Sequence, residues 1–264
     1  MAKAKKTTAK ASKKATPKKA EVVKEVTINL DTFAVPIAIV VAGVIIALTI
    51  FLTNRSSKND VSDSKGANPA VDDSAQAPEG ADVTVALGDD PYIGDKKKAK
   101  VAVVEYSDYQ CGYCKRHSDQ TFPDLKTNFV DTGKILYVFK EFPLGDSGLG
   151  YDTAIAGTCV FDQLGGEKFA EFHKSSMGAA SLADVRANAI SVGVDGKKYD
   201  ECVAAAKFKD NIQANKAEGS KAGISGTPGF VVGKIDKDGN VTGKLIAGAY
   251  PYDTFKSTIE ELLK

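Results

Sequence analysis

Val101-Ala-Val-Val-Glu105-Tyr-Ser-Asp-Tyr-Gln-Cys111-Gly-Tyr-Cys114-Lys-Arg-His117 is the stretch that decides the fold. Its first half is apolar and β-branched, which predicts a buried strand. A short polar turn then leads into a helix that begins at the cysteines. At a helix N-terminus, unpaired backbone N–H groups and the positive end of the helix dipole stabilise an anion. We therefore expect Cys111 to be the acidic, nucleophilic thiol and Cys114 to resolve a mixed disulfide.

The Cys-x-x-Cys spacing also forms half of many zinc sites, so a zinc-binding module is an alternative interpretation. The chain has four cysteines and two histidines. Cys159 and Cys202 stand alone, and His117 and His173 do not have ligand spacing. The sequence therefore favours a redox centre over zinc, and we expect no metal or other cofactor.

The N-terminal part of the chain predicts a membrane anchor. Residues 1–32 form a basic tail with too few apolar side chains to bury a core. Residues 33–53 carry no charge and are long enough to cross about 30 Å of hydrocarbon as one helix. Lysines are more numerous before this run than after it, which predicts a cytoplasmic N-terminus and an extracytoplasmic C-terminal part. The residues after the run make a poor cleavage site, so we expect an uncleaved, single-pass signal anchor in the bilayer of a bacterial cell membrane, and no nucleic-acid binding.

The rest of the chain predicts one domain behind a linker. Residues 54–90 are rich in Ser, Asp, Ala, Asn, Pro and Gly and predict a flexible linker, although Val83–Leu87 has the composition of a short edge strand. Strands over 100–106 and 134–141 flank a helix over 112–130, which Pro123 should kink. This unit has the length of a parallel crossover.

Further along the chain, a helical region is predicted over about residues 150–221. It is followed by two strands, 229–233 and 240–247, joined as a hairpin, and by a final helix over 251–263. Residues 91–264 thus predict an α/β domain with a central mixed sheet and a helical insertion.

Three features together resemble the DsbA-type branch of the thioredoxin superfamily, over about residues 90–264. They are the strand and helix around Cys111 and Cys114, the helical insertion, and Gly226-Thr-Pro-Gly-Phe230 before a strand. The resemblance implies that Pro228 is a cis-proline that places Thr227 beside the disulfide. It also implies that Glu105 is a buried acid that moves protons near Cys114.

The chain also departs from this family. Gly112 and Tyr113 separate the cysteines, whereas strongly oxidising members have Pro-His, whose imidazole helps to stabilise the thiolate. Lys115 and Arg116 are expected on a solvated face of the helix. We expect His117 on a helix surface, and His173 on a helix surface or in its packing.

These features predict a membrane-anchored, extracytoplasmic thiol:disulfide oxidoreductase that introduces disulfides into newly exported proteins. By resemblance, a membrane quinone-linked partner would reoxidise it. A disulfide reductase or isomerase on the same fold remains an alternative, and so does a noncatalytic binding or chaperone module.

The two remaining cysteines predict a second, structural disulfide. Tyr151, Ile155 and Cys159 follow one another at four-residue intervals, and Cys202 lies in a stretch with helical spacing, so both thiols should face the core of the insertion. In an oxidising compartment, two thiols that face one core are expected to pair. Two buried free cysteines remain the alternative.

Overall fold

The computed structural model describes residues 80–264. The predicted basic tail, the apolar run 33–53 and most of the expected linker lie outside the described residues. Within residues 80–264, none of the helices has the length and apolar character needed to cross a membrane.

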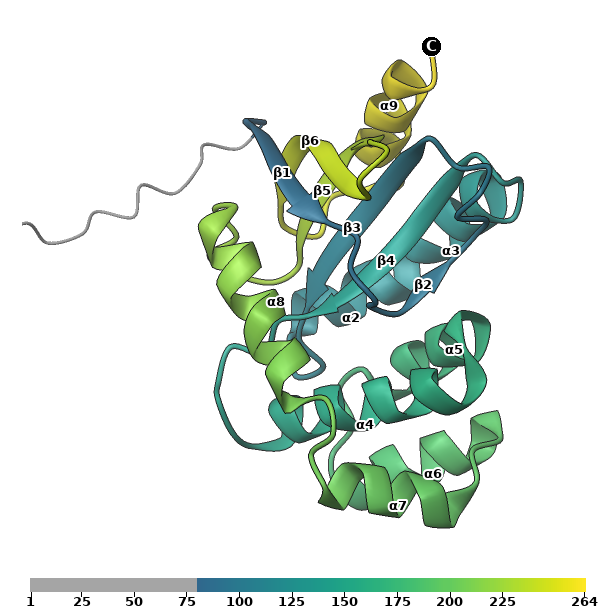
Figure 1. Ribbon diagram of the computed structural model, residues 1–264, viewed down its shortest axis with the longest axis vertical. Coiled ribbons are helices and arrows are strands. Elements are labelled where there is room, and N and C mark those ends of the chain that lie inside the picture. The colour runs from purple at the N-terminus through teal and green to yellow at the C-terminus, as the bar shows by residue number, and fades with distance from the viewer. Residues whose placement is uncertain (1–79) are drawn as a thin grey trace, which may run out of the picture. The chain divides into compact units, whose positions relative to one another are not determined.

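The described chain forms a six-stranded mixed sheet with helices on both faces and a group of helices at one end (Figure 1). The strand order is β1-β6-β5-β3-β4-β2. The strands are β1 (Asp82–Ala86), β2 (Tyr92–Ile93), β3 (Val101–Ser107), β4 (Ile135–Glu141), β5 (Gly229–Ile235) and β6 (Asn240–Ala247). The helices are α2 (Gly112–Gln120), α3 (Phe122–Leu125), the π-helical turn η1 (Lys126–Val130), α4 (Leu149–Leu164), α5 (Gly166–Ser176), α6 (Leu182–Val192), α7 (Gly196–Ala204), α8 (Lys209–Lys221) and α9 (Tyr252–Leu262).

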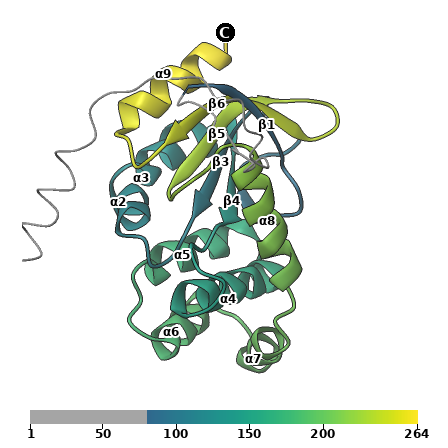
Figure 2. The same ribbon diagram turned by 90° about the vertical axis from the view of Figure 1, so that its left-hand side faces the viewer.

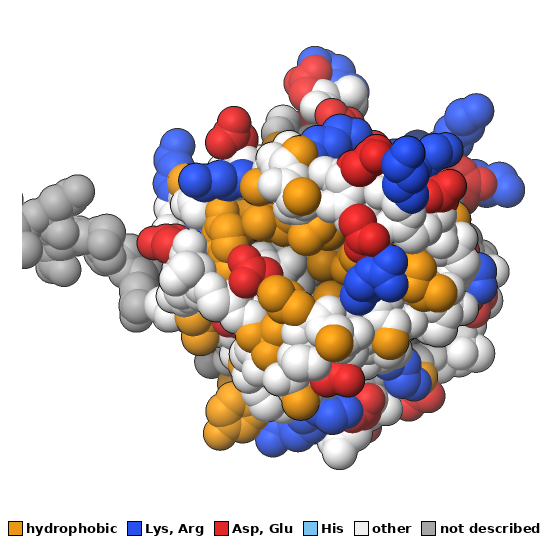
Figure 3. Space-filling model, turned by 90° about the horizontal axis from the view of Figure 1, so that it is seen from below, with side chains coloured by type: hydrophobic (Ala, Val, Ile, Leu, Met, Phe, Trp, Pro, Cys, Tyr) orange, Lys and Arg blue, Asp and Glu red, His pale blue; other side chains and the backbone are white. Residues whose placement is uncertain are grey.

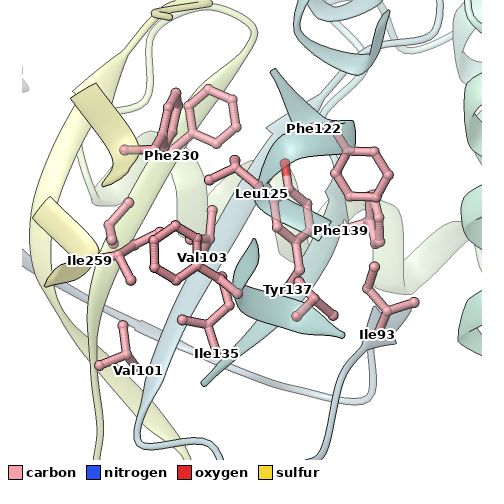
Figure 4. Packing of buried hydrophobic residues seen from close by; sticks show 14 of the residues in the cluster. Ile93, Val101, Val103, Phe122, Leu125, Ile135, Tyr137, Phe139, Phe230 and Ile259 are labelled. Carbon is pink, nitrogen blue, oxygen red and sulfur yellow. The ribbon is translucent and has the colours of Figure 1, made fainter. Parts of the chain in front are cut away.

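Strand β3 lies in the middle of the sheet, parallel to β4 and antiparallel to β5. Helices α2, α3 and α9 cover one face of the sheet and α8 covers the other, as Figure 2 shows. Both faces of β3 are therefore buried, which explains its continuous apolar run. Val101 and Val103 pack in the core on the α9 side, shown in Figure 4 with Tyr137 and Ile259.

The crossover after β3 differs in detail from the single kinked helix predicted over 112–130. Helix α2 ends at Gln120, and Thr121 separates it from α3. Pro123 lies in the first turn of α3, where its missing N–H removes no hydrogen bond. The break therefore comes before the proline, and Pro123 starts a new helix instead of bending the first.

The predicted helical insertion is present as helices α4 to α8 and ends at the predicted residue Lys221. Cys159 on α4 and Cys202 on α7 form a disulfide with a Cα–Cα distance of 6.0 Å. Both belong to the apolar core of the insertion, where Cys159 is fully buried. The surface seen from below the insertion exposes apolar side chains between Lys, Arg, Asp and Glu (Figure 3).

The sheet begins within the segment expected to be linker. Strand β1 pairs antiparallel with β6, with Val85 opposite Val241. Val85 is buried because it faces the core on the α8 side. The short strand expected at Val83–Leu87 is therefore an edge strand of the domain.

A buried ionic cluster fixes α8 against the sheet. The Lys140 Nζ on β4 lies 2.9 Å from Asp90 Oδ2 and 2.7 Å from Glu218 Oε2 on α8. Asn215, also on α8, donates to Asp90 at 2.7 Å, and the Tyr106 hydroxyl donates to Glu218 at 2.9 Å. Lys140 and Asp90 are each only 3% exposed, so each charge relies on these partners in place of water.

Candidate active site

The turn between β3 and α2 sets the position of the first cysteine. Cys111 is the N-cap residue of α2, and its Sγ accepts the backbone N–H of Cys114 at 3.3 Å. Asp108 holds the turn, because its carboxylate accepts the N–H of Gln110 at 2.8 Å and that of Leu144 at 2.9 Å. A thiolate at this position accepts donors that the helix start leaves without an internal partner.

The two thiols have opposite environments. Cys111 is half-buried and Cys114 is fully buried, and both are free in this structure. A hydrogen bond from the Cys114 thiol, assisted by Thr227 and by the backbone N–H groups of Tyr113 and Cys114, lowers the pKa of Cys111 to about 5. Burial, and the hydrogen bond to Cys111, raise the pKa of Cys114. The accessible sulfur is therefore the nucleophilic one.

This difference predicts a selective reaction with iodoacetamide. Labelling of Cys111 in the reduced protein should follow the thiolate fraction, with a midpoint near the pKa of about 5 instead of the free-thiol value of ~8.5. Cys114 should stay unlabelled throughout. Mass mapping of the labelled peptides over a pH series measures both expectations, and preferential labelling of Cys114 would reverse the assignment.

The segment before β5 lies against the same sulfur. The Thr227–Pro228 peptide bond is cis, and the Cys111 thiol donates to the Thr227 carbonyl at 3.2 Å. Thr227 borders two hollows, one of about 390 Å³ that reaches Tyr113 and Arg116, and one of about 220 Å³ lined by residues 223–229 and part of β6. Tyr113 is 63% exposed, so apolar surface flanks the nucleophile.

Glu105 lies beneath the cysteines in the core. It is 1% exposed, and its Oε2 accepts a hydrogen bond of 2.7 Å from the hydroxyl of Tyr137 on β4. Burial raises the pKa of Glu105 to about 7, and the nearby charge of Cys111 adds to the rise. The charge of Glu105 in turn helps to raise the pKa of Cys114, so the two groups compete for one proton.

The expectation of a surface position for His117 is wrong. His117 is 1% exposed and lies between the rings of Phe230 and Phe255, at centroid distances of 4.5 Å and 5.3 Å. Its Nε2 lies 2.9 Å from the Tyr137 hydroxyl oxygen. Burial lowers the pKa of His117 to about 3, so the ring is neutral. The signal was in the sequence, because His117 is three residues after Cys114 and shares its inward face of the helix.

A second buried series of hydrogen-bonded Glu, Tyr and His side chains lies on the same face of the sheet, and it was not predicted from the sequence. The Tyr109 hydroxyl donates to Glu141 at 3.2 Å and lies 3.3 Å from His173 Nδ1. His173 is buried in packing, and this burial lowers its pKa to about 3.

Lys115 and Arg116 are exposed, as expected for a solvated helix face. Within residues 80–264, no group of three or more His, Cys, Asp or Glu side chains is arranged to hold a metal ion.

A partly exposed acidic cysteine at a helix start, a buried second cysteine and an adjoining cis-proline on a mixed sheet define the thioredoxin-like class of proteins. The family model described as thioredoxin matches residues 86–261. The chain therefore belongs to the thioredoxin family, and its helical insertion gives it the DsbA-type form of that fold.

Comparisons with individual proteins agree with this placement. A Rickettsia felis protein named protein-disulfide oxidoreductase is 27% identical over 69% of this chain and 63% of its own length. The chain thus spans less than two thirds of that relative. The structure of BdbD from Bacillus subtilis matches 70% of this chain and 99% of that one, with a TM-score of 0.60 and 21% identity. The Wolbachia pipientis thiol-disulfide exchange protein alpha-DsbA2 matches 65% and 86%, with a TM-score of 0.54 and 26% identity.

Proposed function

We propose that this protein is a thiol:disulfide oxidoreductase whose redox centre is Cys111 and Cys114. The observation that carries the proposal is the position of Cys111: half-buried at the N-terminus of α2, with a lowered pKa, and in contact with the Thr227 carbonyl. A purely structural disulfide has no need of an acidic, accessible sulfur. The names of the Rickettsia and Wolbachia relatives support the same chemistry.

The proposed reaction follows from the two thiol environments. A substrate thiolate attacks Cys111 Sγ of the oxidised enzyme, the Cys111–Cys114 bond breaks, and Cys114 leaves. Because Cys114 is buried, it leaves favourably only if it gains a proton, and Glu105 is the acid beside it. The second substrate thiolate then attacks the substrate sulfur, and Cys111 leaves as a thiolate stabilised by the helix start.

Oxidation of substrates is the direction that the site favours. A thiolate that is stabilised at Cys111 lowers the free energy of the reduced enzyme, and this makes the oxidised enzyme a stronger oxidant. Gly112 and Tyr113 supply no cation of their own to the thiolate, which keeps a reductase or isomerase as the second candidate.

Equilibrium with glutathione tests the direction of the reaction. For an oxidase we expect a potential of the Cys111–Cys114 pair near about −120 mV, whereas a value near about −180 mV would indicate an isomerase and one near about −270 mV a reductase. The oxidised full-length protein should also oxidise a reduced two-cysteine peptide, and failure to do so would exclude the proposed activity.

The two hollows beside Thr227 and the N-terminal sequence support a proposal for the substrates and the partner. An extended peptide with a cysteine fits the hollows on either side of Thr227, which lie next to Cys111. We propose unfolded or newly exported proteins as substrates and a membrane quinone-linked protein as the reoxidising partner.

The lysine-rich residues 1–32 and the uncharged run 33–53 support a single-pass anchor with the catalytic domain outside the cytoplasm. Protease added to intact spheroplasts should then trim the domain. Trimming in permeabilised cells alone would reverse the orientation.

A further inference from the structure

We propose that Glu105, Tyr137 and His117 form a proton path between the buried thiol Cys114 and a surface cleft on the α2 side of the sheet. This inference rests on the proposed function, because it supplies the proton that the reaction places on Cys114. His117 and Tyr137 are then positioning residues that act through Glu105.

The hydrogen bonds give the path a direction. The Tyr137 O–H donates to Glu105 Oε2 at 2.7 Å, so its oxygen accepts the Nε2–H of His117 at 2.9 Å. This assigns the Nε2–H tautomer to His117 and leaves Nδ1 as an acceptor. Nδ1 is buried and has no hydrogen-bond partner among residues 80–264. Three consecutive groups are thus arranged to pass a proton from Nδ1 to Glu105.

The outer end of the path lies beside a surface cleft. His117 lines a cleft of about 420 Å³ together with side chains of α2 and residues 249–252. Arg116 and residues 249–251 border both this cleft and the hollow at Tyr113. The cleft and the hollow at Tyr113 are thus neighbours, and His117 lines the cleft but not the hollow.

The route connects two groups that are shielded from water. Glu105 is 1% exposed and Cys114 is fully buried. A buried carboxylate or thiolate without a proton is disfavoured by its loss of hydration. Each reduction of the enzyme adds a proton to Cys114 and each reoxidation removes one, so a proton must enter and leave the core once in every cycle.

The chain of groups balances both halves of the cycle. On reduction, Glu105 gives its proton to Cys114 and is recharged by Tyr137, which takes the Nε2 proton of His117 while Nδ1 gains a proton from the cleft. His117 is then the Nδ1–H tautomer, and Tyr137 donates to Nε2. On reoxidation, Cys114 returns its proton to Glu105, and every transfer reverses. The path is therefore reset by the reaction itself.

Among residues 80–264, Tyr137 is the hydrogen-bond partner of the His117 ring, and the other side chains around the ring are mostly apolar. Phe230 of β5 and Phe255 of α9 cover the ring with apolar surface. The titratable groups that face it are Tyr137 of β4 with Glu105 behind it, His173 of α5, which helps to lower the pKa of His117, and Cys114 on its own helix. His173 is neutral, so no charged partner holds His117 in one tautomer.

Nitrogen-15 NMR of the histidine rings in the full-length protein tests the path without any thiol substrate. His117 should carry its ring proton on Nε2 in the oxidised protein and on Nδ1 in the reduced protein, and reoxidation should restore the first tautomer. Glu105→Gln should abolish this change. The same His117 tautomer in both redox states, or the same change in Glu105→Gln, would overturn the proposal.

Reduction kinetics give a second, independent readout. Because the chain has no tryptophan, reduction of Cys111–Cys114 by dithiothreitol is followed by acid quench and mass analysis after alkylation. General acid catalysis contributes ~10²–10⁴-fold, and we expect His117→Phe, which keeps the ring packing, to slow reduction about tenfold. Tyr137→Phe should slow it similarly if His117→Phe fails to fold.

His173→Phe is the matched control, because His173 ends the similar chain through Tyr109 but does not line the cleft. Equal slowing in His117→Phe and His173→Phe, or none in His117→Phe, would overturn the path. If the protein fails to oxidise a peptide while the His117 tautomer still follows the redox state of Cys111 and Cys114, the proposed function fails and the proton path stands.

Discussion

Replacement of Cys111 by serine is expected to abolish thiol–disulfide exchange while the fold persists. The hydroxyl of serine is not a nucleophile toward disulfides under these conditions and cannot form the bond with Cys114. Serine is, however, one of the preferred N-cap residues, so it can replace the sulfur as acceptor of the Cys114 N–H at the start of α2. We expect no detectable oxidation of a two-cysteine peptide. The variant should still fold, but at pH 7 its free energy of unfolding should be lower than that of the reduced parent, because serine cannot replace the stabilised thiolate.

Cys114→Ser is the matched control for this experiment. It keeps the reactive sulfur, so it should still be alkylated at Cys111. With the disulfide form of the peptide, the Cys111 thiolate should attack one peptide sulfur, release the other as a thiolate and accumulate a mixed disulfide that no Cys114 resolves. Urea unfolding of both variants separates chemistry from stability. Residual turnover in Cys111→Ser, or a mixed disulfide formed at Cys114, would contradict the assignment of the nucleophile.

Removal of the second disulfide is expected to destabilise the domain without removing its redox activity. The Cys159–Cys202 bond links α4 to α7 across a sequence separation of 43 residues. The chain-entropy model gives about 4 kcal/mol for a loop of this length, as an upper figure because residual structure in the unfolded chain reduces it. We expect the Cys159→Ala/Cys202→Ala variant to lose about 2–4 kcal/mol of unfolding free energy in urea.

The same variant should keep the Cys111–Cys114 potential, because neither cysteine of the second bond contributes to the hydrogen bonds of Cys111. A loss below about 0.5 kcal/mol would show that the insertion is held together by its apolar core, with the bond adding nothing.

Much of the fold could be predicted because its local patterns agree with the tertiary structure. The apolar run before Cys111 indicated β3, the glycine-punctuated region after residue 149 indicated the insertion, and the spacing around Cys159 indicated which face of α4 is buried. The place of β1 beside β6 could not be predicted, because five residues with weak alternation do not determine a pairing partner 150 residues away in the chain.

The thiols of the candidate site were recognisable from the sequence, but the buried side chains that are hydrogen-bonded to Glu105 and Tyr137 beneath them were not. Cys111, Cys114 and Thr227 belong to short motifs, whereas Tyr137 reaches Glu105 only because β3 and β4 are parallel neighbours in a particular register. His117 was assigned to the surface as an ordinary helix histidine, although its spacing of three residues from Cys114 places it on the inward face of α2. The buried chain from Tyr109 to Glu141 joins the ends of two strands, and neither local sequence signals it.

The Lys140 cluster limits how far the insertion can move. Helix α8 is the segment by which the insertion returns to the sheet, and Asn215 and Glu218 join it to Lys140. To move α8 away from the sheet would separate Lys140, which is 3% exposed, from the carboxylates that replace its hydration. We therefore expect the hollows beside Cys111 to keep their shape when a peptide binds, and a rigid site of this kind would favour chains that are unfolded enough to conform to it.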